Sequence, residues 1–181
     1  MSTPLADERW LAFARDVIEH VVRNAPPPDT PLPDNPQPRG GVFVTLHKLG
    51  RLRGCIGNLD TSISLAEAIR DAAEGAALRD PRFSPVRSDE LAQIRIRLSI
   101  LTPLRPMKSL DEIVMGRTGI VVRTADARGL FLPEVAAHCR DREEFLSRCC
   151  SEKMHRSDQA WRDAETETML FETEVFDEPE R

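Results

Sequence analysis

Residues 52–57, with the sequence LRGCIG, bring a guanidinium, a thiol and two glycines together within six positions. Cys55 is the residue with chemical potential, because a thiolate is a nucleophile and a redox group. Arg53 would favour the thiolate, and His47 or a nearby amide would assist. This hypothesis requires a partly exposed, electropositive Cys55. On a strand without a bulge, Arg53 and Cys55 share a face, which favours the hypothesis.

The alternative interpretation is that Cys55 is a buried structural residue, since free cysteines are among the most buried residue types. Gly54 and Gly57 would then mark a bulge, a bend or a close approach by another group, because glycine inside a strand gives up backbone entropy and packing. Buried cysteines are common and catalytic ones are rare. We therefore favour the structural role and keep a Cys55-dependent enzyme as the alternative.

A stiff loop follows later in the chain, at residues 80–86 with the sequence DPRFSPV. Its Asp80, Arg82 and Phe83 would line a groove together with LRGCIG, and the groove would receive a partner protein or a small ligand. An internal ion pair between Asp80 and Arg82 is an equally open interpretation, as is a core position for Phe83. The full set of binding candidates is Arg53, Gly54, Cys55, Ile56, Gly57, Asp80, Arg82 and Phe83.

The LRGCIG segment must be positioned by a β-hairpin, because apolar residues alternate along 42–46 and the chain returns from 52 to 59 after a turn near Gly50. Cross-strand partners share a face, so the turn length should decide where Cys55 points. A two-residue turn puts Cys55 opposite Val44 or Leu46. A three-residue turn puts it with Phe43 or Thr45, and the sequence leaves both open.

The remaining patterns predict helices and strands in an order typical of an α+β protein. A capping box, Ser64 to Glu67, begins a helix that should end before Asp80. A proline-rich connector spans 24–40, where helix and inner strand are excluded. The other predicted helices are 7–23, 109–115, 133–138 and one opening at 141, and the other predicted strands are 94–101, 119–123, 130–132 and 168–175.

Nucleic-acid binding would use a sheet face carrying Arg53, Arg95 and Arg97. The net charge of −5 and the 5% aromatic content argue against it, because such faces need a basic surface and stacking rings. We therefore do not expect nucleic-acid binding.

Composition describes an ordinary globular protein of 181 residues, and we expect one folding unit. No apolar run approaches the roughly 18 residues of a membrane span, and the acidic N-terminus lacks the order of a signal peptide. We expect a cytoplasmic protein with no membrane contact. Because the cytoplasm is reducing, we expect its four cysteines to be free thiols. A zinc site would need His138, Cys139, His155 and either Cys149 or Cys150 to converge, so we expect no metal and no cofactor.

Five segments in the same order carry a family resemblance: 41–46, 52–57, 80–86, 98–103 and 130–135. Together they resemble the AMMECR family, whose bacterial and archaeal members are called protein A of the AmmeMemoRadiSam system. The resemblance covers nearly the whole chain, and LRGCIG is its most diagnostic segment.

This resemblance implies an α+β fold, with an antiparallel sheet packed with helices, a smaller α/β lobe, and a cleft between them near LRGCIG. It also implies association with a MEMO-type protein, which looks like a dioxygenase, and with a radical-SAM enzyme. It implies no defined reaction. One departure is Lys153-Met154-His155-Arg156, where the family has a KAGL-like segment, so the contacts made there are not carried over.

Overall fold

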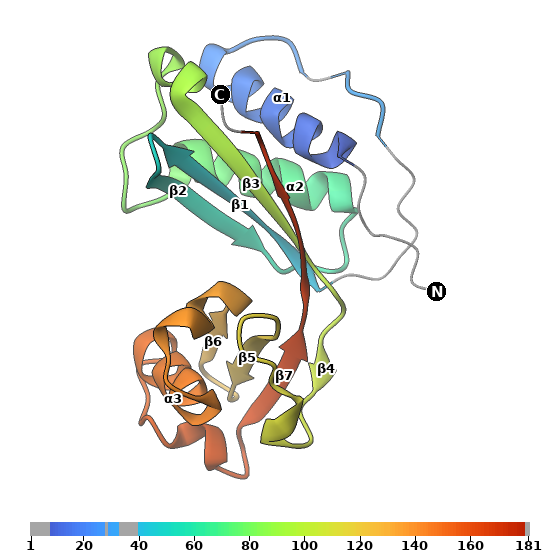
Figure 1. The fold of residues 1–181 in the computed structure, drawn as a ribbon. Helices are drawn as coiled ribbons and strands as arrows, with labels where there is room; N and C mark the ends of the chain where they lie inside the picture. The colour runs from blue at the N-terminus through green and yellow to red at the C-terminus, as the bar shows by residue number, and fades with distance from the viewer. Residues whose placement is uncertain (1–7, 28, 33–39, 180–181) are drawn as a thin grey trace. The chain divides into compact units, whose positions relative to one another are not determined.

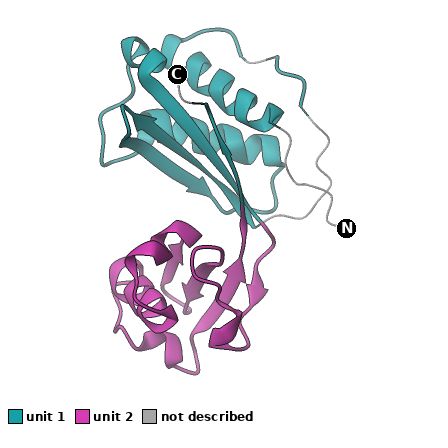
Figure 2. Ribbon diagram, viewed as in Figure 1, with its two compact units in different colours: residues 1–101, 174–181 teal, residues 102–173 magenta. Residues whose placement is uncertain are grey.

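The computed structural model describes residues 8–27, 29–32 and 40–179. The chain forms two compact units, unit 1 with residues 1–101 and 174–181 and unit 2 with residues 102–173 (Figure 2). Each unit holds a four-stranded sheet, and the pairings within both are antiparallel, so the predicted α+β class is confirmed. The single folding unit and the cleft stay predictions.

The sheet of unit 1 has the strand order β2-β1-β3-β8. Its strands are β1 (Gly41–Lys48), β2 (Arg51–Asn58), β3 (Ile94–Leu101) and β8 (Thr173–Asp177). Helices α1 (Arg9–Arg23) and α2 (Leu65–Glu74) pack together on one face of this sheet (Figure 1). A short 3-10 helix, η2 (Ser88–Gln93), leads into β3. The hairpin and the first helix are confirmed.

The two faces of this sheet are set by alternation along the strands. Val42, Val44 and Leu46 are fully buried in the core beneath the helices. Their neighbours in β1 therefore point to the opposite side. We call that side the open face; it carries Phe43, Thr45 and His47 of β1 and Arg95, Arg97 and Ser99 of β3.

The helix after the hairpin begins and ends as the sequence predicts. Ser64 accepts the Glu67 N–H, and the Glu67 carboxylate accepts the Ser64 N–H at 2.9 Å, which completes the capping box. After Glu74 the helix continues as one wide π-helical turn, η1 (Gly75–Arg79), and stops at Asp80. Most of the small residues of α2 and η1 are buried, so the helix lies close against the sheet; they are Ala68, Ala72, Ala73, Gly75, Ala76 and Ala77.

Unit 2 has a second sheet with the order β4-β7-β5-β6. Phe131 stacks on Phe145 at a centroid distance of 5.7 Å in its core. The strands are β4 (Arg105–Pro106), β5 (Gly119–Arg123), β6 (Arg128–Phe131) and β7 (Glu167–Phe171), and the helices are η3 (Leu110–Glu112), η4 (Pro133–His138), α3 (Arg142–Lys153) and η5 (Ala160–Arg162). The segment 133–138 is helical as predicted, but as a 3-10 helix.

The prediction of one final strand over 168–175 was wrong. The chain forms β7 in the sheet of unit 2, breaks at Glu172, and continues as β8 in the sheet of unit 1. Thr102 N–H donates to the Glu172 carbonyl and Glu178 N–H to the Ile96 carbonyl, which aligns β8 along β3. The alternating pattern runs through the break, so the sequence does not reveal it.

Part of the proline-rich connector lies outside the described residues. Residues 24–27 and 29–32 form neither helix nor strand, as expected of that stretch, whereas 28 and 33–39 are not described. No helix in the described part of the chain is both long and apolar enough to cross a membrane.

Candidate functional site

LRGCIG lies along β2, and a β-bulge decides how it faces. The turn has two residues, Leu49 and Gly50, between the paired Lys48 and Arg51. Further along, Leu46 pairs with Gly54 while His47 pairs with Leu52, so Arg53 is the extra residue of the bulge. Turn length alone would have placed Cys55 opposite Val44. The expectation that the turn sets the direction of Cys55 was therefore wrong, because the bulge shifts the register by one.

Cys55 consequently pairs with Thr45 and shares its face of the sheet. The Thr45 hydroxyl oxygen lies 3.2 Å from the Cys55 sulfur, within hydrogen-bond distance. Cys55 is partly buried. Cys55 is thus neither fully buried nor exposed, and its thiol has a polar neighbour.

The two glycines of LRGCIG are explained by close approaches. A Cβ at position 54 would lie 2.2 Å from the Ala76 carbonyl oxygen, which the π-helical turn presses against β2. At position 57 it would lie 2.4 Å from the Phe43 ring. Ile56, between them, packs against the core of unit 1. The structural explanation of these glycines is confirmed.

Asp80 and Arg82 clamp the main chain of Cys55. Asp80 Oδ2 accepts the Cys55 backbone N–H at 2.8 Å, and Arg82 Nη2 donates to the Cys55 carbonyl at 3.2 Å. The two side chains also form an ion pair at 2.7 Å. Because β2 is an edge strand, the clamp satisfies main-chain groups that no neighbouring strand pairs. The interpretation of an internal ion pair that fixes the loop is confirmed.

The electrostatics of the clamp follow from burial and charge. Asp80 is only 4% exposed. Hydrogen bonds from the Arg82 side chain, more than those from backbone N–H groups, hold the Asp80 pKa well below its ordinary value. The Arg82 pKa is raised, chiefly by the same pair and in small part by Cys55. Phe83 is half-buried, with the Arg82 guanidinium 5.5 Å from its ring centroid.

Arg53 is fixed by a different partner. Its guanidinium donates to Glu90 at 3.2 and 2.9 Å and to the Ser84 and Pro85 carbonyls at 2.8 and 3.2 Å. Glu90 also accepts Lys48 Nζ at 2.8 Å. The Arg53 side chain, followed by that of Lys48, lowers the Glu90 pKa to about 2. Arg53 and Cys55 were expected to share a face on a strand without a bulge. That condition is not met, and the Arg53 side chain binds Glu90.

His47 lies two positions along β1 from Thr45, the partner of Cys55, and opposite Leu52. Among the described residues, no hydrogen bond joins the His47 ring to the Cys55 thiol. His47 instead lines a hollow of about 630 Å³ together with Arg95 and Arg97. A second hollow of about 410 Å³ includes Arg53. Of the predicted site residues, these two hollows are lined only by His47 and Arg53. The predicted groove lined by Asp80, Arg82 and Phe83 stays a prediction.

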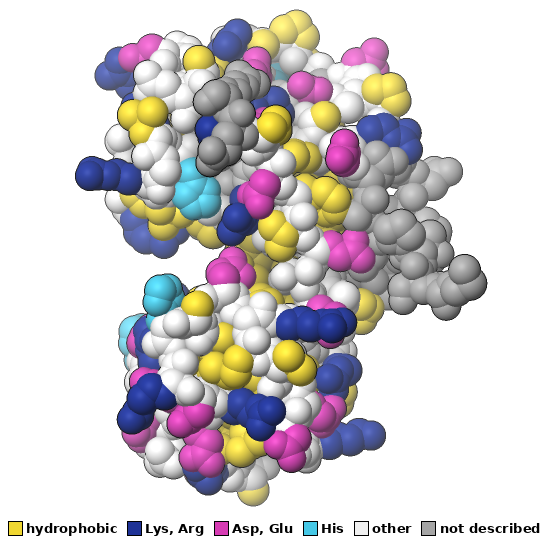
Figure 3. All heavy atoms as spheres, viewed as in Figure 1, with side chains coloured by type: hydrophobic (Ala, Val, Ile, Leu, Met, Phe, Trp, Pro, Cys, Tyr) yellow, Lys and Arg dark blue, Asp and Glu magenta, His cyan; other side chains and the backbone are white. Residues whose placement is uncertain are grey.

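The sheet face with Arg53, Arg95 and Arg97 that nucleic-acid binding would need does not form. Arg95 and Arg97 lie on the open face, but Arg53 does not, because of the bulge. Arg97 is ion-paired with Asp177 at 2.7 Å. On the side of the molecule that Figure 3 shows, Lys and Arg side chains are interspersed with Asp and Glu.

The other cysteines lie in unit 2. Burial raises the pKa of Cys149 to about 12 and also raises the pKa values of Cys139 and Cys150, so all three stay protonated near neutral pH. Within the described ranges, no group of three or more His, Cys, Asp or Glu side chains is arranged to hold a metal ion.

The segment 153–156 lies at the end of α3. Lys153 Nζ is 5.8 Å from the Phe131 ring centroid, Met154 is buried, and Arg156 pairs with Asp126. At the position where the sequence departs from the family's KAGL-like segment, these side chains therefore make contacts within unit 2.

Sequence reasoning missed two functional candidates, the turn residue Leu49 and the ion-pair centre Glu90. Leu49 has a backbone φ of 50°, which is a left-handed conformation, and it is 79% exposed to solvent. The sequence did contain a signal for Leu49. Two-residue hairpin turns favour Asn-Gly, and this turn has Leu49-Gly50 instead.

Comparisons with known proteins show similarity to one family over nearly the whole chain. The AMMECR1 family profile matches residues 11–176. A protein of Methanothermobacter thermautotrophicus is 41% identical over 178 residues, with 93% of this chain and 92% of the relative covered. A protein of Thermococcus gammatolerans is 39% identical over 186 residues, covering 94% and 89%. The crystal structure of uncharacterized protein PH0010 from Pyrococcus horikoshii superposes with a TM-score of 0.82 at 34% identity, covering 96% and 93%.

Proposed function

The chain belongs to the AMMECR1 family, and from that premise we propose that it is a binding component of a multi-protein system. The proposed partners are a MEMO-type protein and a radical-SAM enzyme, the two that the resemblance of the sequence implied. The proposed contact surface is the hairpin tip, which we define as Leu49, Arg51 and Leu52. One observation carries the proposal, the conformation and exposure of Leu49.

Leu49 combines two features that a free surface position does not favour. A left-handed conformation is costly for a leucine, and the turn would accept asparagine at less cost. The residue is also 79% exposed, and Leu52 beside it is 42% exposed. Strained residues concentrate at functional positions, and central apolar anchors provide much of the binding energy at protein interfaces. A partner that covers the tip would recover the apolar area that Leu49 leaves in water.

Charge defines the chemistry of that partner. The smaller hollow beside the tip is lined by Lys48, Arg51 and Arg53 against one carboxylate, Glu90. Glu90 already binds Lys48 and Arg53, and Arg51 is exposed. The matching surface therefore carries an apolar pocket for Leu49 and a carboxylate for Arg51.

The test is isothermal titration calorimetry with the purified MEMO-type protein from the same genome, repeated with the radical-SAM enzyme. Leu49→Asn should weaken binding by about tenfold or more, as expected for an anchor worth over about 1.4 kcal/mol. Arg51→Gln should weaken it less and reduce its salt dependence. The matched control is Val114→Thr, at an apolar position 52% exposed in unit 2, which should leave the affinity unchanged. Equal binding by Leu49→Asn and wild type would refute the proposed surface.

A second candidate function is an enzyme that uses the Cys55 thiol. The observation in its favour is the Cys55 sulfur beside the Thr45 hydroxyl in a partly buried residue, with Arg82 bound to the carbonyl of the same residue. The test compares iodoacetamide alkylation of the folded protein with that of a model thiol near pH 7, with Cys55→Ser identifying the site. Faster alkylation at Cys55 would favour the enzyme. A Cys55 that stays unmodified until denaturation would exclude it.

A further inference from the structure

β6 is an edge strand of unit 2, and its outer side is unpaired. In the described chain it pairs with β5 and with no other strand. Thr124 N–H donates to the Ala127 carbonyl at 2.9 Å, so the next cross-strand pair, Arg123 and Arg128, is of the non-hydrogen-bonded kind. The backbone N–H and carbonyl groups of Arg128 and Leu130 therefore point away from β5. Within the described ranges, these groups have no hydrogen-bond partner.

A row of charged side chains ends at this edge. Glu167 of β7 lies opposite Arg123 of β5, which lies opposite Arg128 of β6, so the three side chains share one face of the sheet. Arg123 is ion-paired with Glu167 at 2.6 Å. The carboxylate of the β5–β6 turn, Asp126, is paired with Arg156. In the part of the chain that the structure describes, the Arg128 side chain has neither an ion pair nor a hydrogen bond, so the row lacks a second carboxylate.

The positive charge at this edge is therefore not balanced. Burial and the neighbouring Arg123 lower the pKa of Arg128, yet an arginine side chain keeps its charge in a protein. A second cation lies near the other face of the strand, where Lys153 Nζ of α3 is 5.8 Å from the Phe131 ring centroid. A carboxylate placed beside Arg128 would gain an ion pair and relieve the repulsion between the two arginines.

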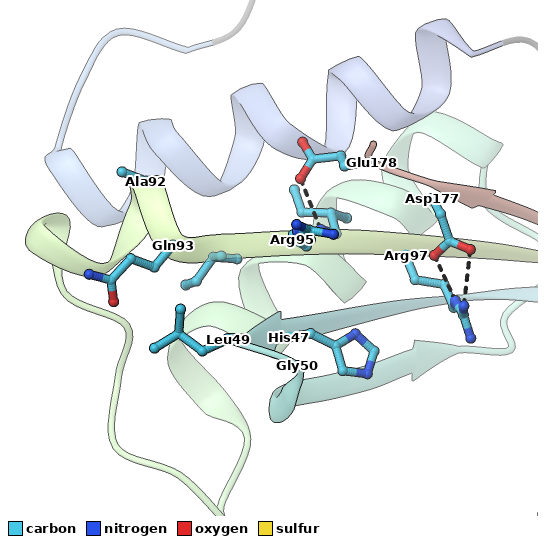
Figure 4. A pocket seen from close by; sticks show the side chains of 11 residues that line it. His47, Leu49, Gly50, Ala92, Gln93, Arg95, Arg97, Asp177 and Glu178 are labelled. Carbon is cyan, nitrogen blue, oxygen red and sulfur yellow. Dashed lines mark hydrogen bonds and ion pairs between the residues drawn. The ribbon is translucent and has the colours of Figure 1, made fainter. Parts of the chain in front are cut away.

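Charged groups at two other sheet edges are balanced inside the protein. At β2, Asp80 and Arg82 bind each other and the main chain of the strand. At β8, the Asp177 carboxylate is bound by Arg97 of the neighbouring strand (Figure 4). The remaining edge strand, β4, is two residues long and includes Pro106, which has no N–H to donate. The β6 edge differs in joining unpaired main-chain groups to an unbalanced charge.

We propose that the outer edge of β6 binds an extended segment of a partner protein, which adds as a further strand and places a carboxylate opposite Arg128. Main-chain hydrogen bonds to Arg128 and Leu130 attach the segment, and its alternate side chains give the selectivity. The partner residues opposite these two positions share one face, so the segment carries an acidic residue two positions from an apolar one. Arginine at the edge disfavours strands without the matching charge.

This surface lies in unit 2, whereas the hairpin tip lies in unit 1, so it does not depend on the partners proposed for the tip. Leu130 is partly buried and supplies the apolar position of the edge. Together with Arg128 it defines the pattern that the partner segment must match.

The test follows the backbone amide resonances of the isotope-labelled full-length protein by NMR. The probe is a synthetic cyclic β-hairpin peptide whose outer strand alternates threonine and valine, with one glutamate in place of a valine. The cyclic constraint reduces the entropy lost on binding. A matched peptide has glutamine at the glutamate position. We expect saturable shifts at the Arg128 and Leu130 amides with a Kd below about 1 mM, and a Kd about threefold higher for the glutamine peptide. No saturable shift at these amides, or equal affinity of the two peptides, would overturn the proposal.

Variants separate the charge from the main-chain contacts. Arg128→Gln should bind the glutamate peptide no more tightly than the glutamine peptide, because the ion pair is lost. The matched control Arg140→Gln, at an exposed arginine of unit 2 that pairs with Glu144, should bind both peptides as the wild type does. Leu130→Pro removes an outward N–H without a bond to β5, so it should weaken both peptides alike. Equal losses in the Arg128 and Arg140 variants would contradict the site, whether or not Leu130→Pro folds.

Two further measurements identify the occupant and the place of binding. Leu49→Asn should leave peptide binding unchanged, and a loss there would place the peptide at the hairpin tip and overturn the β6 site. The amide resonances of Arg128 and Leu130 should not move when the protein is concentrated without peptide. Movement would identify a second copy of the chain as the occupant, and the proposal of an acidic partner segment would fail.

Discussion

Asp80 accepts the backbone N–H of Cys55 at 2.8 Å, across 25 positions of the sequence. This bond ties the loop after η1 to the outer edge of β2, and Arg82 completes it at the Cys55 carbonyl. The loop side chains thus bind the N–H and the carbonyl of Cys55 in the way that a neighbouring strand would. The conformation of LRGCIG therefore depends on a buried carboxylate that lies far from it in sequence.

Replacing Asp80 by asparagine should destabilise the protein. The variant loses a charged acceptor that is nearly buried and that binds both Arg82 and the Cys55 N–H. We expect the free energy of unfolding to fall by about 1.5–3 kcal/mol, the range for hydrogen bonds to charged groups. Urea denaturation measures it. Asp89→Asn, at an exposed ion pair of the same unit, should leave the unfolding midpoint unchanged, and an equal loss in both would rule out the clamp as the cause.

Stability should fall as the solution becomes acidic. The Glu90 pKa is lowered from 4.5 to about 2 in the folded protein, and the Asp80 pKa is lowered from 3.8. A carboxyl group with a depressed folded pKa stabilises the fold above its unfolded pKa and loses that contribution as pH falls toward its folded pKa. The loss should therefore begin near pH 4.5 and continue to pH 2 and below.

Glu90→Gln isolates one part of that acid dependence. The variant should be less stable at pH 7 by about 1–2 kcal/mol after solvent screening, and should lose less stability between pH 4.5 and pH 2. Chemical denaturation across that pH range measures both quantities. An acid dependence identical to that of the wild type would show that Glu90 does not contribute to it.

Alanine at the two glycines of LRGCIG should have unequal effects. At position 54 the new Cβ meets the Ala76 carbonyl oxygen, which is backbone and cannot rotate away. We expect a loss of about 3 kcal/mol or more for Gly54→Ala. At position 57 the Cβ meets the Phe43 ring, a side chain that can shift, so we expect about 1–2 kcal/mol. Thermal and urea unfolding test the order, and a larger loss for Gly57→Ala would contradict it.

Leu49→Asn should raise the stability of the isolated protein while it weakens partner binding. Asparagine tolerates the left-handed conformation, so we expect a gain of about 0.5–1 kcal/mol in the free energy of unfolding. Leu52→Asn, at an exposed strand position, should give no such gain. A loss of stability in Leu49→Asn would mean that Leu49 serves the fold, and the strain argument would fail.

Much of the fold follows from local patterns that the sequence displays. The capping box at Ser64 and Glu67, the alternation in 42–46 and 94–101, and the stop before Pro81 each depend on neighbours in the chain, so the sequence predicts them. The glycines of LRGCIG correctly indicated a close approach. The break at Glu172 was hidden, because one alternating pattern serves strands in two different sheets.

The sequence by itself determined which residues form the hairpin and that Asp80 and Arg82 could pair. Only the tertiary structure decided where the chemistry faces. A bulge at Arg53 shifts the register by one position, so the Cys55 side chain points to the open face. The Arg53 side chain instead binds the Glu90 carboxylate. The physical reason is that strand side chains alternate with period two, so a single unpaired residue reverses every direction that follows. That residue is fixed by contacts with Glu90 and the 84–85 carbonyls, which no local pattern encodes.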